Sequence, residues 1–215
     1  MLDLIFLLGI AVIIFIRLFK IFGHTDNNSS TAKVFENSVD NFDKEAQKPA
    51  DIEIISATEA ALAPHIRDVF DKIREVEGNF NADVFVSCAK KAFITIINAF
   101  TKYDKQSLQM LLSSDVYKVF SREMEKRISS GYLYNKTIIG VRDVEITDAY
   151  ISDHLASITL RIVSDQVSYV KDKAGNLLNG NTEKIVIVED AWQFGKKIGQ
   201  DKIWLLLSTS AVTRQ

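Results

Sequence analysis

The sequence predicts an α+β protein: an N-terminal transmembrane helix, then helices packed on one face of a curved, four-stranded antiparallel sheet. Three observations carry this prediction. An apolar run opens the chain, apolar residues then repeat every three to four positions, and in the second half they alternate with polar residues. The segments between the alternating runs are short, which favours antiparallel pairing.

The apolar run spans residues 4–16 without a charge and reaches Phe22 if Arg17 and Lys20 snorkel toward the lipid headgroups. At about 1.5 Å per residue it measures roughly 28 Å, close to the bilayer's hydrocarbon core of about 30 Å. The alternative, a cleaved signal peptide, needs a basic start and a small-x-small cleavage site, and the sequence has neither. Because the basic residues follow the run, we expect residues 1–22 to be an anchor with the remainder in the cytoplasm.

Residues 23–57 carry seven acidic residues and three lysines with little periodicity, which predicts a flexible acidic linker. Residues 58–215 carry a net charge of +1 and form the predicted folded domain. A nearly neutral domain lacks the basic surface that nucleic-acid binding requires, so we expect no nucleic-acid partner. The single cysteine, Cys88, excludes an internal disulfide and a cysteine metal site.

Four helices are expected in the first half of the domain. Pro64 suits the first turn of a helix that ends at Gly78. A second helix, over about residues 82–103, is apolar on most sides, which predicts that it is buried. Asp104 can cap a third, short helix, and one of residues 113–115 can cap a fourth.

Four strands are expected after the helices. Residues 136–146 are rich in β-branched side chains, residues 156–162 and 186–194 alternate cleanly, and residues 203–208 form a last apolar strand. After Val163 the apolar positions move to the other face, which predicts a bulge and a bend.

Catalytic signatures are absent: the sequence contains no G-x-G-x-x-G, phosphate-loop, G-x-S-x-G or H-E-x-x-H motif. The three histidines lack metal-ligand spacing, so we expect no metal, no cofactor and no enzymatic activity. Asp190 leaves one alternative open. It shares a strand face with Trp192 and Phe194, where a carboxylate could act as the general base of a small isomerase or hydratase. The simpler interpretation is a hydrogen-bonded aspartate at the bend.

Several motifs occur together in the domain: F-x-x-x-AKKAF, AF-x-x-x-D and LLSSDVY-x-x-F within residues 80–120, and D-x-W-x-F at residues 190–194. Together they resemble the C-terminal domain of subunit 44 of the mitochondrial inner-membrane translocase. The resemblance covers about residues 51–208, and the whole chain is similar to the membrane-anchored bacterial branch of that family. It implies a cystatin-like roll, also seen in nuclear-transport-factor-like proteins, that encloses an apolar pocket.

The same resemblance implies an adaptor rather than an enzyme. Together with the charge placement around the apolar run, it leads us to expect one span in a bacterial inner membrane and a cytoplasmic domain. The implied partner is a protein of the translocation or envelope-assembly machinery. A seventy-kilodalton heat-shock chaperone and lipid are further candidates. Type IV secretion assembly proteins place a similar roll on the opposite side of the membrane, which is the alternative orientation.

Two binding sites are predicted on the domain. The first is the apolar stripe of the helix that starts at Pro64: Ile66, Val69, Phe70, Ile73 and Val76. The second is the pocket, which we expect to be lined by Asp190, Trp192, Phe194, Phe93 and Ile97. The polar face of the first helix is charge-balanced, which favours packing against the domain or a protein over a lipid surface. In the simpler alternative both sets belong to the core.

Overall fold

The computed structural model describes residues 57–212. The predicted anchor at residues 1–22 and the predicted linker, apart from its last residue, lie outside this part of the chain. The described helices are α3 (Ala57–Ala60), α4 (Pro64–Glu77), α5 (Ala82–Thr101), α6 (Lys105–Leu111) and α7 (Ser114–Ser130). Helices α4 to α7 are the four that the sequence predicts, and α3 is an additional single turn.

Local sequence explains where these helices begin and end. Pro64 opens α4, where its missing N–H is not needed. The side chains of Asn81, Asp104 and Ser113 accept hydrogen bonds from first-turn N–H groups of α5, α6 and α7. Gly131 ends α7 in the left-handed conformation, with a φ of 66°.

The strands β1 (Leu133–Ser152), β2 (Leu155–Lys171), β3 (Leu177–Gly180), β4 (Val186–Lys197) and β5 (Leu205–Ala211) form one antiparallel sheet. Its order is β1-β2-β4-β5, and β3 pairs with the end of β2. The predicted α+β architecture is confirmed, but the expected number of four strands is wrong because β3 adds a fifth. This strand has four exposed residues, so it shows none of the alternation on which the prediction rests.

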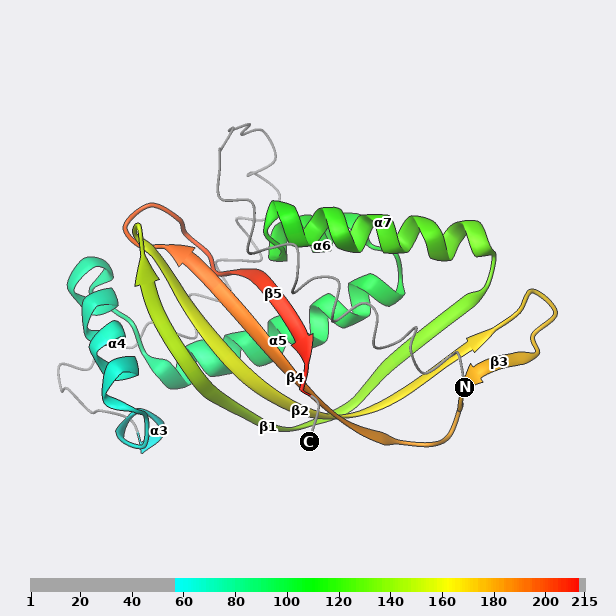
Figure 1. Cartoon of the computed structure of the whole chain (residues 1–215), viewed down its shortest axis with the longest axis horizontal. Helices are drawn as coiled ribbons and strands as arrows, with labels where there is room; N and C mark the ends of the chain where they lie inside the picture. The colour runs from blue at the N-terminus through cyan, green and yellow to red at the C-terminus, as the bar shows by residue number, and fades with distance from the viewer. Residues whose placement is uncertain (1–56, 213–215) are drawn as a thin grey trace.

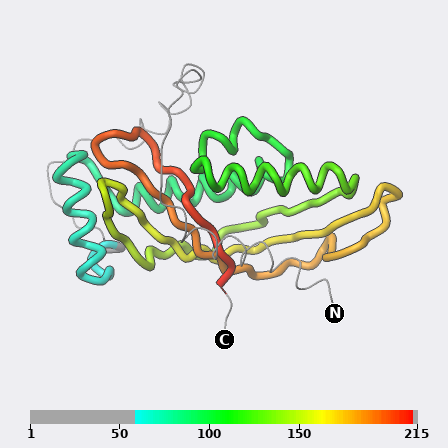
Figure 2. The backbone as a smooth tube through the Cα atoms, turned by 45° about the horizontal axis from the view of Figure 1, so that its top comes forward, coloured from blue at the N-terminus to red at the C-terminus, as the bar shows by residue number. Residues whose placement is uncertain are grey.

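The sheet is strongly bent, with α5, α6 and α7 on one side of it (Figures 1 and 2). Helices α3 and α4 lie at one end of the molecule, and the β3 hairpin lies at the other (Figure 1). The bend coincides with irregularities in β1, because its register against β2 shifts between Ile138 and Gly140, between Val141 and Asp143, and between Ile146 and Asp148.

The predicted change of face in the second strand has a different cause from the one expected. β2 pairs with β4 without a shift from Leu155 to Gln166. Its inward positions after Ile162 are occupied by Ser164 and Gln166, both fully buried. The apolar pattern therefore moves to the outer face although the register of β2 does not slip.

The inward face of the sheet and the helices enclose one hydrophobic core. β2 contributes four alternate residues with 0% exposure: Ala156, Ile158, Leu160 and Ile162. Among the described residues, α5 is the one helix that is long and apolar enough to cross a membrane by length and composition. Seven of its twenty residues are buried in this core and seven others are exposed, so the helix is buried along one face, and the prediction that it is buried on most sides is wrong.

Candidate functional site

The side chains of the predicted pocket are core residues in close mutual contact. Phe93, Trp192 and Phe194 are at most 2% exposed, and Ile97 is 8% exposed. The rings of Phe93 and Trp192 meet edge to face at 4.8 Å between centroids, an arrangement that aromatic pairs favour. The structure therefore brings these residues together as expected, but they pack against one another and leave no open pocket between them. This is the simpler alternative, in which the set belongs to the core.

Asp190 lies at the border of this core, on the inward face of β4 opposite Ile162. Burial raises the pKa of its carboxyl, while the charge of Lys136 and a hydrogen bond with Gln166 act in the opposite direction. Burial also lowers the pKa of Lys136, with Asp190 opposing that shift. Because the neighbouring aromatic rings pack on one another, the alternative of a general base in a substrate pocket gains no support.

The sequence alone does not identify the polar neighbours of Asp190, which are Lys136 and Gln166. Lys136 lies 54 positions earlier, on β1, and Gln166 lies on β2. Gln166 donates a hydrogen bond to the Ser164 hydroxyl at 2.8 Å, and both side chains are buried at the bend. The sequence gives one sign of this polar group. The inward positions of β2 are apolar up to Ile162, but the next two, Ser164 and Gln166, are polar.

The predicted stripe on α4 is also part of the core. Ile66, Phe70 and Ile73 are at most 2% exposed and Val69 is 9% exposed. The prediction that the stripe offers a surface to a partner does not fit this arrangement, because the helix turns these side chains toward the domain. Val76 differs, with 54% exposure at the end of the helix.

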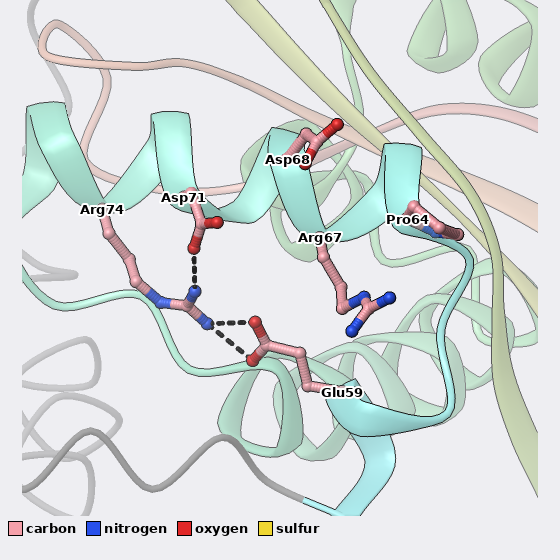
Figure 3. Close-up of a pocket in the computed structure, with 6 residues that line it drawn as sticks. All are labelled: Glu59, Pro64, Arg67, Asp68, Asp71 and Arg74. Atoms are coloured by element: carbon pink, nitrogen blue, oxygen red, sulfur yellow. Dashed lines mark hydrogen bonds and ion pairs between the residues drawn. The ribbon is translucent and has the colours of Figure 1, made fainter.

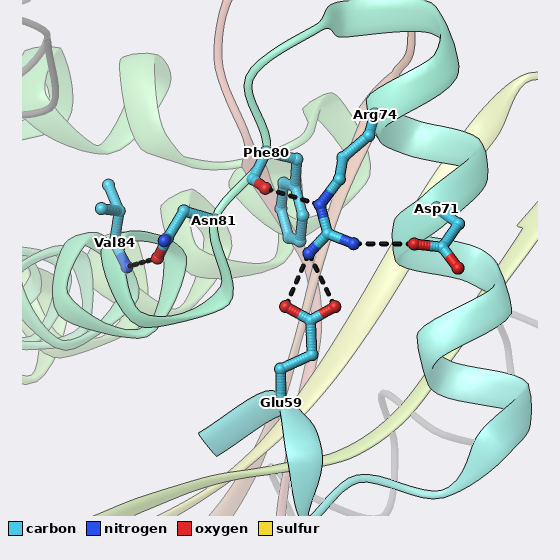
Figure 4. A network of polar contacts seen from close by, with 6 residues as sticks. All are labelled: Glu59, Asp71, Arg74, Phe80, Asn81 and Val84. Atoms are coloured by element: carbon cyan, nitrogen blue, oxygen red, sulfur yellow. Dashed lines mark hydrogen bonds and ion pairs between the residues drawn. The ribbon is translucent and has the colours of Figure 1, made fainter. Parts of the chain in front are cut away.

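Polar contacts hold α4 in place at both ends and in the middle. His65 contacts Asp148 of β1 at 3.2 Å. Lys196 of β4 donates a hydrogen bond to Glu77 at 2.7 Å. Between these contacts lies Arg74, whose side chain is surrounded by three acceptors (Figure 4). These contacts fix the position of the helix, while the burial of its apolar stripe drives the packing.

Arg74 uses all three guanidinium nitrogens. Its Nη2 donates to both carboxylate oxygens of Glu59 at 2.6 Å, its Nη1 to Asp71 at 2.8 Å, and its Nε to the Phe80 carbonyl at 3.0 Å (Figure 4). Burial disfavours the charged form of Arg74, but the hydrogen bond and charge of Glu59 raise its pKa above the ordinary value. Arg74 thereby joins α3, α4 and the loop before α5.

A shallow pocket of about 220 Å³ lies beside this network, between α3 and α4 (Figure 3). Glu59, Pro64, Arg67, Asp68, Asp71 and Arg74 line it. The Nε of Arg67 is buried there and has no hydrogen-bond partner among residues 57–212. Three carboxylates against two guanidinium groups give the lining a net negative charge, which does not favour an anionic ligand.

Exposed apolar side chains are frequent on four segments away from α3 and α4: the end of α7, the start of β1, the β3 hairpin and the start of β4. Figure 1 shows where these segments run, and β4 starts opposite Gln166, five positions before Lys171 on β2, so it begins nearer the bend than β3 does. We call this surface the distal apolar end and define it by Ile128, Tyr132, Leu133, Leu177, Leu178, Ile185, Val186 and Ile187, which are 42–57% exposed. Lys171 pairs with both Leu133 and Leu177, so three strands meet here. The run KIVIV, residues 184–188, is its sequence signal, but the same run is equally typical of a buried strand.

Comparisons with known proteins agree with the fold. A model of the Tim44-like domain matches residues 66–211. No curated protein matches the chain. In all, 38 chains of solved structures are similar to it. One is the crystal structure of the intermembrane space region of the chloroplast protein ARC6, which is 12% identical with a TM-score of 0.46 and covers 63% of this chain and 99% of that chain.

The family model accounts for well over half of the chain, and it contains the helices and strands on which the sequence motifs lie. The resemblance identified from those motifs is thereby confirmed. The chain belongs to the Tim44-like domain family.

Proposed function

We propose that the protein is a membrane-tethered, non-enzymatic adaptor that binds a protein partner through the distal apolar end. In this proposal residues 1–22 anchor the chain in a bacterial inner membrane, residues 23–57 are the linker and residues 58–215 form a cytoplasmic roll. The partner belongs to the protein-translocation or envelope-assembly machinery. The observation that carries the proposal is the number of exposed apolar side chains on the segments that make up the distal apolar end.

Such a surface is unusual for a domain that acts alone. Soluble proteins scatter single apolar side chains over their surface, whereas a concentration of them in one part of a domain is typical of an interaction site. Eight of the thirteen large exposed hydrophobic residues in the described part of the chain belong to the distal apolar end. Polar residues of the β3 hairpin adjoin it, including Lys171, Asp172 and Lys173, as expected for the rim of a protein interface.

The position of this surface also suits a tethered adaptor. The described chain begins at α3, at the end of the molecule opposite the β3 hairpin (Figures 1 and 2). A flexible linker of the predicted length spans about 30–35 Å on average. Attachment at one end would then leave the other end accessible, and tethering would raise the local concentration of the domain near membrane partners.

The test compares the full-length wild type with the Leu177→Lys/Ile187→Lys double variant and with Val84→Lys as a matched control. Val84 is 39% exposed on α5, outside the distal apolar end. Proteins that co-purify from detergent-solubilised membranes are quantified by mass spectrometry. We expect the double variant to lose its main partner by about tenfold or more, because a charge would be buried in an apolar contact. Val84→Lys should retain that partner.

An unchanged set of partners in the double variant would contradict the proposal. A heat-shock chaperone among the lost proteins would identify that candidate. If the purified protein instead bound anionic vesicles through these residues and lost no protein partner, a lipid-binding role would replace the adaptor role.

A further inference from the structure

Helix α3 and the turn after it make few inward-facing contacts for a segment that starts the domain. Of residues 59–63, Glu59 is 4% exposed and Leu62 is partly buried against the core, whereas the three alanines are exposed. Glu59 points from α3 toward Arg74, away from the solvent (Figure 4). A glutamate is an uncommon choice for such a buried position, since carboxylates are rarely buried unless paired.

Arg74, on the other side of the contact, is held by the body of the domain. The carbonyl of Phe80 binds Arg74, and the Phe80 ring packs on Phe70 at 4.9 Å and on Phe85 at 5.9 Å between centroids. Asp71 holds the guanidinium from α4. Arg74 would therefore keep its position if Glu59 moved away, because two of its three partners belong to the body of the domain.

A buried ion pair behaves differently from an apolar contact when a segment detaches. Its attraction is largely offset by the removal of charge from water. When Glu59 detaches it returns to water, and Arg74, already 31% exposed and still held by Asp71, gains hydration where Glu59 lay, so much of what separation loses is restored. Removal of one partner alone is costly, because the other charge stays buried and uncompensated. An ion pair therefore holds a segment in one defined place while permitting reversible release.

We propose that residues 57–63 form a strap that opens and closes independently of the rest of the domain, with the Glu59–Arg74 ion pair as its latch. Opening would free seven residues and add about 24 Å of extended chain between the domain and whatever precedes it. That gain in reach matters only if the chain is tethered as proposed above, whereas the opening itself does not depend on the tether.

Hydrogen exchange of the full-length protein in detergent, read by mass spectrometry, tests the strap. In the wild type, the Leu62 N–H, which donates to the Glu59 carbonyl, should exchange faster than the amides of α5 and at a rate insensitive to low urea. Glu59→Ala should accelerate exchange over residues 57–63 by about tenfold or more and leave α5 within about twofold. Asp71→Asn is the matched control. It removes the charge of an exposed partner of Arg74 and keeps Glu59, so the strap should stay within about threefold of the wild type.

Two results would overturn the strap: residues 57–63 exchanging with the same rate and urea dependence as α5, or Glu59→Ala accelerating both regions equally. If the strap opens but the distal apolar end has no partner, the strap is confirmed and the adaptor role is refuted. If a partner is confirmed but the strap does not open, the adaptor role is supported and the strap is refuted.

Discussion

Asp190 is the residue at which sequence pattern and environment conflict most clearly. A raised pKa in the folded state means that folding favours the protonated carboxyl. The ionised form therefore lowers stability above the folded-state pKa, and this cost disappears as the pH falls through it. We expect Asp190→Asn to unfold at a higher urea concentration than the wild type at pH 7, with the difference shrinking as the pH approaches about 4.

Urea unfolding at a series of pH values, followed by circular dichroism, measures this dependence. Asp68→Asn, at an exposed position of α4, controls for the general effect of removing a negative charge. If Asp190→Asn proves less stable at pH 7, the charge of Lys136 outweighs burial and the direction argued here is wrong.

Phe93 tests whether the aromatic set is packed core. It is 0% exposed and sits edge to face with Trp192. Phe93→Ala should lower the free energy of unfolding by about 3–5 kcal/mol, because the removed ring leaves a cavity. Val84→Ala on the exposed face of the same helix should change it by about 0.5 kcal/mol or less. A loss below about 1 kcal/mol for Phe93→Ala would instead indicate the open pocket that the sequence suggested.

At the scale of elements, the β3 hairpin depends on a glycine. Gly180 has a φ of 78°, and an added Cβ would lie 2.2 Å from the Ser168 carbonyl oxygen. Gly175, in the turn before β3, has a φ of 88° and open space around it. Gly180→Ala should therefore detach β3 from β2, whereas Gly175→Ala should cost only about 1–2 kcal/mol of left-handed strain.

Hydrogen exchange over residues 177–180 distinguishes these two variants. Protection of β3 should be lost in Gly180→Ala and largely kept in Gly175→Ala, while α5 stays protected in both. Equal protection of β3 in both variants would show that the backbone adapts and that Gly180 is not required.

Elements with strong local signals were predictable from the sequence, and those set by distant contacts were not. Helices α4 to α7 carry their own caps and periodicity, which is why Pro64, Asp104 and Ser113 indicated their starts. Strand β3 has no buried face, and the bulges of β1 depend on the register with β2. The candidate site was predictable only in part for the same reason. The position of Asp190 on its strand is visible in the sequence, but its neighbour Lys136 comes from a different strand.

At the scale of the whole molecule, the charges around the N-terminal apolar run predict its orientation. Arg17 and Lys20 follow the run, so the domain should be cytoplasmic. A C-terminal fusion to a reporter that is active only after export should therefore show no activity above background, whereas a fusion to a cytoplasmic reporter should be active. Strong activity of the exported reporter would place the domain on the other side of the membrane, as in the type IV secretion alternative.

The proposed adaptor role requires that the distal apolar end contacts a protein, and in-cell photocrosslinking tests this most directly. A photoreactive amino acid is placed at Leu177 or Ile187 in the full-length protein, and at Val84 for comparison. We predict a discrete crosslinked protein from both distal positions, with none from Val84. If neither distal position captures a protein, while Val84 does or while the purified protein binds anionic vesicles through those same residues, the adaptor role proposed here is contradicted.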